Sequence, residues 1–143
     1  MTRLQAAIAA ALFLGTALPA TAADLTVHVS QIRNASGRVY VTLWDSAGNW
    51  LDADKSLQDL SVTANPGIIT VVFHDVPPGR YGVVTFHDEN GNGQMDFDLL
   101  GLPTEGYAFS NDVRPFLSAP SFDRAAISLG KDDAALTIRM VYP

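Results

Sequence analysis

The strongest chemical signal in this sequence is a run of carboxylate and carboxamide side chains separated by single residues. Side chains of this type stand at Asp88, Asn90 and Asn92, a glycine follows at Gly93, and a further carboxylate stands at Asp96. Oxygens at alternate positions converge on one cation when the backbone curls around it, and a glycine at the sixth position permits the sharp turn. The spacing therefore matches the first nine positions of a calcium-binding loop.

The remaining ligands of such a site come from the residues that follow. Gln94 is expected to contribute its main-chain carbonyl, and because Leu99 stands where these loops carry a bidentate Glu, Asp98 or Glu105 must supply the last carboxylate. The predicted metal ligands are Asp88, Asn90, Asn92, Gln94, Asp96, Asp98 and Glu105. Hard oxygen ligands favour Ca²⁺ over zinc or copper, and a structural role is expected for the ion. The alternative is that Asn-Gly-Asn-Gly forms a solvated turn without an ion.

The elements that must position this loop are short strands. Alternating or β-branched runs bounded by Gly, Pro and Asn turns predict strands at residues 25–29, 39–44, 68–73, 81–87, 125–129 and 136–142. The last two are interpreted as a hairpin across residues 130–133. No segment has a helical period over a helical length. The sequence therefore predicts an all-β fold, a single antiparallel β-sandwich of the immunoglobulin or prealbumin type with six to seven strands.

Residues 88–112 interrupt this spacing with about 25 residues that lack a strand pattern. The segment contains Leu99, Leu100, Leu102 and Phe109, which makes it too apolar for a disordered tail. We therefore expect one long, ordered, acidic loop that packs on the sandwich.

The N-terminus predicts export. Arg3 precedes an apolar run, and Ala20-Thr21-Ala22 has the small-residue pattern of a cleavage site. The domain prediction is a signal peptide at residues 1–22 and a β-sandwich domain at residues 23–143, with no membrane span after cleavage. A periplasmic or secreted location follows, and the chain contains no cysteine, so neither disulfides nor thiolate chemistry is available.

Charge and composition restrict the classes of partner and activity that the sequence supports. The formal net charge is −6 at pH 7, which leaves no basic surface for nucleic acid. No nucleophile elbow is present, so the chain is interpreted as non-enzymatic. His28, His74 and His87 lie at predicted strands and are interpreted as supporting residues rather than a shared metal site. Trp50, in a weakly patterned stretch, is expected to be exposed.

Several longer motifs carry a family resemblance. They are Pro77-Pro78-Gly79-x-Tyr81, the run at residues 87–93, Gly101-x-Pro103-x-Glu105-Gly106-Tyr107-x-Phe109-Ser110-Asn111, and Pro120-Ser121-Phe122. Together with the N-terminal signal they resemble the bacterial domain-of-unknown-function family numbered 2141. The resemblance implies an exported prealbumin-like or immunoglobulin-like β-sandwich and implies no activity.

These observations lead to an exported binding module for an unknown protein or glycan partner, in which calcium makes a presentation surface rigid. Two alternatives stay open. One is a hydrolase or other enzyme that uses the acidic loop and His87, and the other is a carbohydrate-binding or adhesion module that uses exposed aromatic side chains.

Overall fold

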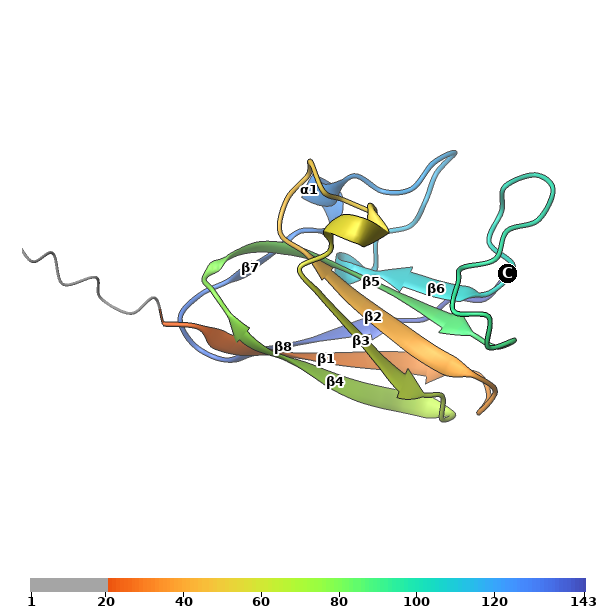
Figure 1. Cartoon of the computed structure of the whole chain (residues 1–143), viewed down its shortest axis with the longest axis horizontal. Coiled ribbons are helices and arrows are strands. Elements are labelled where there is room, and N and C mark those ends of the chain that lie inside the picture. The colour runs from red at the N-terminus through yellow and green to blue at the C-terminus, as the bar shows by residue number, and fades with distance from the viewer. Residues whose placement is uncertain (1–20) are drawn as a thin grey trace, which may run out of the picture.

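The computed structural model of the chain describes residues 21–143, which form two facing β-sheets (Figure 1). The strands in this part of the chain are β1 (Ala23–Ile32), β2 (Arg38–Trp44), β3 (Gln58–Thr63), β4 (Gly67–Val76), β5 (Gly79–Asp88), β6 (Gly106–Phe109), β7 (Ile127–Leu129) and β8 (Ala134–Arg139). Short helical segments are η1 (Ala53–Lys55), η2 (Ser110–Asp112) and α1 (Phe122–Ala125). The predicted all-β sandwich is confirmed, with eight strands instead of six to seven.

The two sheets differ in size and connection. One has the order β4-β1-β8, and the other has the order β3-β2-β5-β6 with β7 beside β5. The pairs are antiparallel except for β1 and β8, which run parallel. The predicted hairpin of residues 125–129 and 136–142 is wrong, because β7 pairs with β5 and β8 pairs with β1 in the opposite sheet. The turn between them carries the chain from one sheet to the other.

The core lies between the sheets and follows the period-two pattern of the strands. Leu25, Val27 and Val29 of β1 are fully buried, and the residues between them are only half-buried. The facing strand β2 alternates in the same way. Burial of each such side chain stabilises the fold by about 1.5–3 kcal/mol, so the alternation determines which face of each strand turns inward.

The edge strand β6 was not predicted, and its presence shortens the expected loop. Tyr107 pairs with Phe86 of β5 on one side and exchanges two main-chain hydrogen bonds of 2.9 Å with Val141 on the other. The ring of Tyr142 lies over Gly106, where an added Cβ would come within 2.3 Å of it. These contacts link the two sheets at this edge, and the loop between β5 and β6 is confined to residues 89–105, here called the acidic loop.

Two predictions concern the membrane and the N-terminus. The predicted signal peptide at residues 1–22 falls, except for its last two residues, outside the part of the chain that the structure describes. Within residues 21–143, no helix has the length and apolar character needed to cross a bilayer.

Candidate binding groove and acidic loop

A buried carboxylate directly before the acidic loop closes a tight turn. Asp88, the last residue of β5, has no exposed surface. Its Oδ1 accepts hydrogen bonds from the main-chain N–H groups of Gly91 (2.8 Å) and Asn92 (3.1 Å), and its Oδ2 accepts one from Gly93 (2.8 Å). Both glycines have positive φ, 76° and 77°, which the turn requires and which side chains disfavour. Asp88 therefore orients the backbone of the first turn.

The next polar side chains continue the turn in the same manner. Asn90 Oδ1 accepts from the Asn92 N–H (3.0 Å), and Asn92 Oδ1 accepts from the Gln94 N–H (2.9 Å). The two amide groups donate to the carboxylate of Asp96, at 2.6 Å from Asn90 and 2.9 Å from Asn92. Asp88, both asparagines and Asp96 thus lie in one compact turn, while the side chain of Gln94 makes no hydrogen bond in the described residues.

Glu105 lies at the other end of the loop and returns to its base. Its carboxylate is 5% exposed, with Oε1 accepting from the Glu89 N–H (3.2 Å) and Oε2 from the Asp96 N–H (3.3 Å). Burial raises the pKa of Glu105, and the nearby carboxylates of Asp96 and Asp88 raise it further, against the two N–H donors. Negative charge is therefore concentrated at the base of the loop, in a place where a cation would relieve it.

Asp98 does not join this group. Its Oδ1 accepts from the N–H groups of Leu100 (2.8 Å) and Leu102 (2.9 Å), so it closes a separate turn at the exposed tip. Within residues 21–143, no group of three or more His, Cys, Asp or Glu side chains is arranged to hold a metal ion. An ion at the base of the loop would therefore need amide and main-chain oxygens as well as carboxylates, the mixed donor set that calcium accepts.

An ion pair connects the acidic loop to the residues that follow strand β1. Glu89 binds the Arg33 guanidinium at 2.6 Å and accepts from the Asn34 amide at 2.6 Å. Burial acts to raise the pKa of Glu89, but donation from Arg33 and Asn34 outweighs it and lowers the pKa. The Arg33 guanidinium also lies 4.3 Å above the ring of Tyr142. The first residue of the loop is thereby held to the C-terminal segment that covers β6.

His87, the histidine of the enzymatic alternative, is buried and supports the start of the acidic loop. Its side chain has no exposed surface, and its two nitrogens contact the Ser36 carbonyl (2.7 Å, Nε2) and the Tyr142 hydroxyl (2.8 Å, Nδ1). Because a carbonyl only accepts, Nε2 carries the proton, and in the neutral ring Nδ1 accepts from Tyr142. Both nitrogens are engaged, so His87 helps to position the start of the loop.

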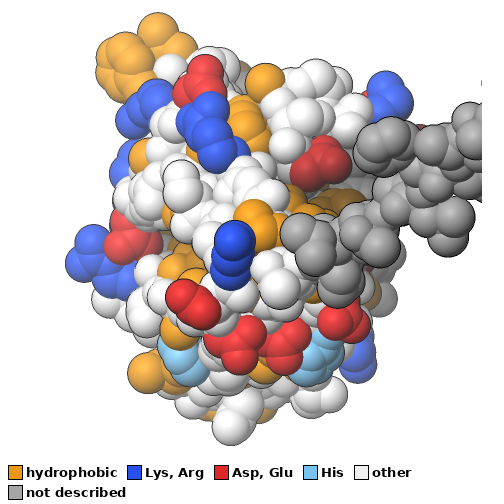
Figure 2. Space-filling view, turned by 90° about the vertical axis from the view of Figure 1, so that its left-hand side faces the viewer, with side chains coloured by type: hydrophobic (Ala, Val, Ile, Leu, Met, Phe, Trp, Pro, Cys, Tyr) orange, Lys and Arg blue, Asp and Glu red, His pale blue; other side chains and the backbone are white. Residues whose placement is uncertain are grey.

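The other two histidines lie on the outer face of the three-stranded sheet. His28 contacts the Thr70 hydroxyl (2.8 Å), and His74 contacts the carboxylate of Asp24 (2.8 Å). Figure 2 views the end of the sandwich away from the acidic loop and shows acidic side chains gathered between two histidine side chains. The three histidines therefore do not share a site.

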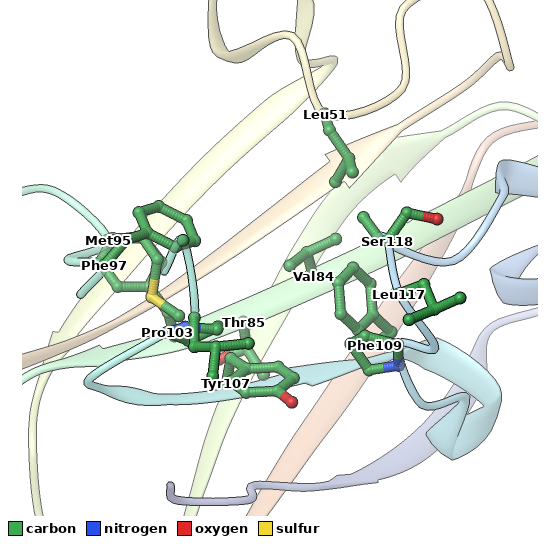
Figure 3. Close-up of a pocket in the computed structure, with 15 residues that line it drawn as sticks. Leu51, Val84, Thr85, Met95, Phe97, Pro103, Tyr107, Phe109, Leu117 and Ser118 are labelled. Atoms are coloured by element: carbon green, nitrogen blue, oxygen red, sulfur yellow. The ribbon is translucent and has the colours of Figure 1, made fainter. Parts of the chain in front are cut away.

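A groove on the outer face of the five-stranded sheet is the feature that sequence reasoning missed. Its cavity measures about 530 Å³. Alternation along β5 turns Val84 and Phe86 outward, and their partners in β6, Phe109 and Tyr107, complete the floor. Leu51 lies above the floor in Figure 3.

Two loops form the walls of this groove. Figure 3 shows Met95 and Phe97 of the acidic loop on one side, and Leu117 of the segment before α1 on the other. In Figure 1 these two loops rise from the same face of the sandwich. The tips are apolar and unusually exposed, since Leu99 has 105% and Leu117 has 98% of the accessible surface of a free side chain. The expectation that the apolar residues of the loop pack on the sandwich is therefore wrong for its tip.

Trp50 also differs from the prediction. It is half-buried rather than exposed, and its indole N–H donates to the Pro120 carbonyl at 2.8 Å. Its ring packs edge-on against Trp44 and Phe122, and it covers Gly82, where a Cβ would lie 2.3 Å from the indole. The aromatic side chains near it therefore close the part of the sheet face beyond the groove. The sequence held two signals for an interaction surface, the aromatic side chains of the adhesion alternative and the leucines Leu99, Leu100 and Leu102 in a polar loop.

The architecture defined by these observations is a β-sandwich with one apolar outer face and a loop-walled groove. A model of the family described as "uncharacterized protein conserved in bacteria (DUF2141)" matches residues 27–137, and the chain belongs to this family. The chain is similar to the crystal structure of a fimbrial assembly protein from Parabacteroides distasonis, with 8% sequence identity and a TM-score of 0.40. That comparison covers 85% of this chain and 53% of the fimbrial structure, so the chain spans about half its length. None of the curated proteins with which the chain was compared matches it.

Proposed function

We propose that this chain is an exported, non-enzymatic binding module that takes an apolar ligand in the groove between the acidic loop and residues 113–120. The observation that carries the proposal is the groove itself, because its floor of mainly apolar side chains lies between two loops with exposed apolar tips. Large apolar patches of this kind on a soluble domain mark interaction sites. The volume of about 530 Å³ lies in the range of ligand pockets, roughly 300–1,000 Å³.

The exposure of the walls supports binding over packing. Phe97 is 59% exposed and Leu102 is 57% exposed, although burial of a large apolar side chain stabilises a fold by about 1.5–3 kcal/mol. Leaving such side chains in water brings no stability to the free protein. A ligand that fills the groove would remove part of this surface from water, and the gain would appear as affinity.

The proposed role of calcium follows from the positions of the base and the middle of the acidic loop. The base of the loop holds Asp88, Asn90, Asn92, Asp96 and Glu105, and these residues would hold the ion. The middle of the loop supplies a groove wall. An ion at the base supplies positive charge where the carboxylates crowd together, and it would keep the wall in one position. The chain's own residues then bind and orient the ligand.

The hydrogen bonds of the His87 ring support a binding role for the protein rather than a catalytic one. Both ring nitrogens are used inside the fold, and the ring is covered by Tyr142 and the Ser36 carbonyl. A general acid or base must reach the proton that it transfers, within hydrogen-bonding distance or through one water. No Asp, Glu, His, Cys or Lys side chain lines the groove.

The groove is tested by ligand-detected NMR with a mixed library of charged, polar and apolar small molecules. Parent protein is compared with Val84→Trp, which fills the floor, and with Val72→Trp, a matched half-buried valine on the outer face of the other sheet. We expect some compounds to lose their saturation-transfer signal in Val84→Trp and to keep it in Val72→Trp. If no compound behaves in this way, the groove is not a ligand site.

The calcium proposal is tested by thermal unfolding in EDTA, in calcium and in magnesium. With a Kd of roughly 10⁻⁴ to 10⁻³ M, 10 mM calcium should stabilise the fold by about 1.4–2.7 kcal/mol. We expect a calcium-specific rise in Tm that is lost in Asp96→Asn and kept in Asp98→Asn, because Asp98 lies in the separate tip turn. No rise in the parent would mean that the loop is a solvated turn.

A further inference from the structure

The groove offers an unusual chemical surface, and its lining restricts what it can bind. The inference that follows rests on the proposed function and names the class of ligand. None of the residues that line the groove is Asp, Glu, Lys, Arg or His. A charged ligand would therefore lose hydration there without gaining an ionic partner, which is strongly unfavourable.

The charges that flank the acidic-loop wall of the groove oppose anions. Asp96 and Asp98 flank the wall residue Phe97, and the whole chain carries a net charge of −6 at pH 7. An anionic ligand would be repelled by this field as it approached. It would also find no cation in the lining. Carboxylates, phosphates and sulfonates are therefore poor occupants, and the electrostatic fit is to an uncharged molecule.

The aromatic side chains determine the shape of that molecule. Figure 3 shows Phe97 on one side of the cavity and Phe109 on the other, with Val84 between them. On the floor, Tyr107 and Phe109 meet edge to face, with ring centroids 6.1 Å apart and an angle of 72° between the planes. Flat rings interact favourably with such aromatic groups in stacked or edge-on arrangements.

From these observations we propose that the groove takes an uncharged molecule with a flat, apolar ring system, held between Phe97 and Phe109. The edge-to-face floor and the ring on the opposite wall favour a ring over a saturated chain. Leu117, an exposed apolar residue of the opposite wall, would shield the bound ring from water.

The first experiment follows the fluorescence of N-phenyl-1-naphthylamine, a neutral probe with a naphthyl and a phenyl group, titrated with the protein in calcium. Competition then uses three compounds with one ring system, 2-naphthalenemethanol, 2-naphthoate and 2-naphthylmethylammonium, and a saturated alcohol, decanol. We expect the neutral aromatic alcohol to displace the probe at concentrations at least tenfold lower than the two ions and decanol.

Two variants locate the binding. Phe97→Ala removes one of the aromatic walls, and we expect probe affinity to fall about five- to tenfold. Ile68→Ala is the matched control, because Ile68 is 64% exposed and Phe97 is 59% exposed, and Ile68 lies on β4 in the opposite sheet. Probe affinity should not change in this control.

The outcomes separate the class of ligand from the existence of the site. Competition by 2-naphthoate or by the ammonium compound as strong as that by the alcohol would overturn the uncharged class, and equal competition by decanol would overturn the ring. In each case the groove would remain a ligand site if Phe97→Ala still weakens binding. Absence of probe binding, or equal losses in Phe97→Ala and Ile68→Ala, would overturn both the ligand class and the proposed function.

Discussion

The outer faces of the two sheets differ in chemistry although both sheets contribute to one core. On the three-stranded sheet, His28 pairs with Thr70 and His74 pairs with Asp24, and these polar groups face water. On the five-stranded sheet, the rings of Tyr40 and Phe86 stack with centroids 4.9 Å apart and lead toward the groove. Polar side chains on a sheet face are hydrated by water, whereas apolar side chains are stabilised when another group covers them. In this protein Trp50 covers one part of the apolar face, and the groove leaves another part open.

The carboxylates at the two faces lead to the largest expected difference in stability. Asp88 is fully buried and accepts three main-chain hydrogen bonds, whereas the side chain of Asp24 is 41% exposed and contacts the His74 ring and the Asp75 N–H. Asp88→Ala should lower the free energy of unfolding by about 2–4 kcal/mol, because several loop donors lose their acceptor. Asp24→Ala should have a much smaller effect. Urea unfolding of both variants measures the difference, and equal losses would refute the distinction.

A second difference lies inside the five-stranded sheet. The hydroxyl of Thr85 is the one buried side-chain polar atom in the described residues that lacks a hydrogen-bond partner. Removing it with the nearly isosteric Thr85→Val should raise the free energy of unfolding by about 1 kcal/mol. The control is Thr26→Val on the other sheet, where the side chain is only half-buried and the gain should be smaller. A loss of stability in Thr85→Val would mean that the hydroxyl is satisfied in the native protein.

The pH dependence of the loop base gives a smaller, directional effect. The raised pKa of Glu105 means that the folded protein binds a proton more tightly than the unfolded chain does. Its contribution to stability is therefore present below the unfolded pKa, near 4.5, and is lost as the pH rises through the raised folded pKa. In EDTA, the Tm of Glu105→Gln relative to the parent should increase from pH 4 to pH 7. A difference that stays constant or decreases over this range would contradict the role assigned to burial.

The smallest effect on stability is expected at the loop tips. Leu99→Ser and Leu117→Ser should change the free energy of unfolding by no more than about 0.5 kcal/mol, because both side chains are fully exposed. Ile138→Ser, in the core, is the contrasting variant and should be severely destabilising. A large loss of stability in either tip variant would show that the tips pack against the protein in solution.

Local patterns predicted much of this fold, and long-range pairing decided the remainder. Alternation identified the strands around Val27, Val41 and Val83, since each buries every second residue. The four-residue edge strand at Gly106–Phe109 was missed because its pairing with β5 and with Val141 lies far away in sequence. The spacing from Asp88 predicted a compact turn, because its hydrogen bonds span only three to five residues.

The position and the lining of the groove could not be predicted for the same physical reason. Phe97, Phe109 and Leu117 come from three separate segments, and only the pairing of β6 with β5 brings them around one cavity. By contrast, Glu105 was predicted as a candidate ligand from its carboxylate side chain and its position in the sequence, and the structure places it beside Asp96 and Asp88. Asp98, the other candidate, lies in the tip turn.

The most direct test of the central claim is a map of amide chemical shifts in ¹⁵N-labelled protein as N-phenyl-1-naphthylamine is added. The account predicts that the perturbed residues surround Val84, Phe97 and Phe109, and that those around His28 and Thr70 on the opposite face do not move. Shifts spread over both faces, or confined to the three-stranded sheet, would contradict the assignment of the groove as the ligand site.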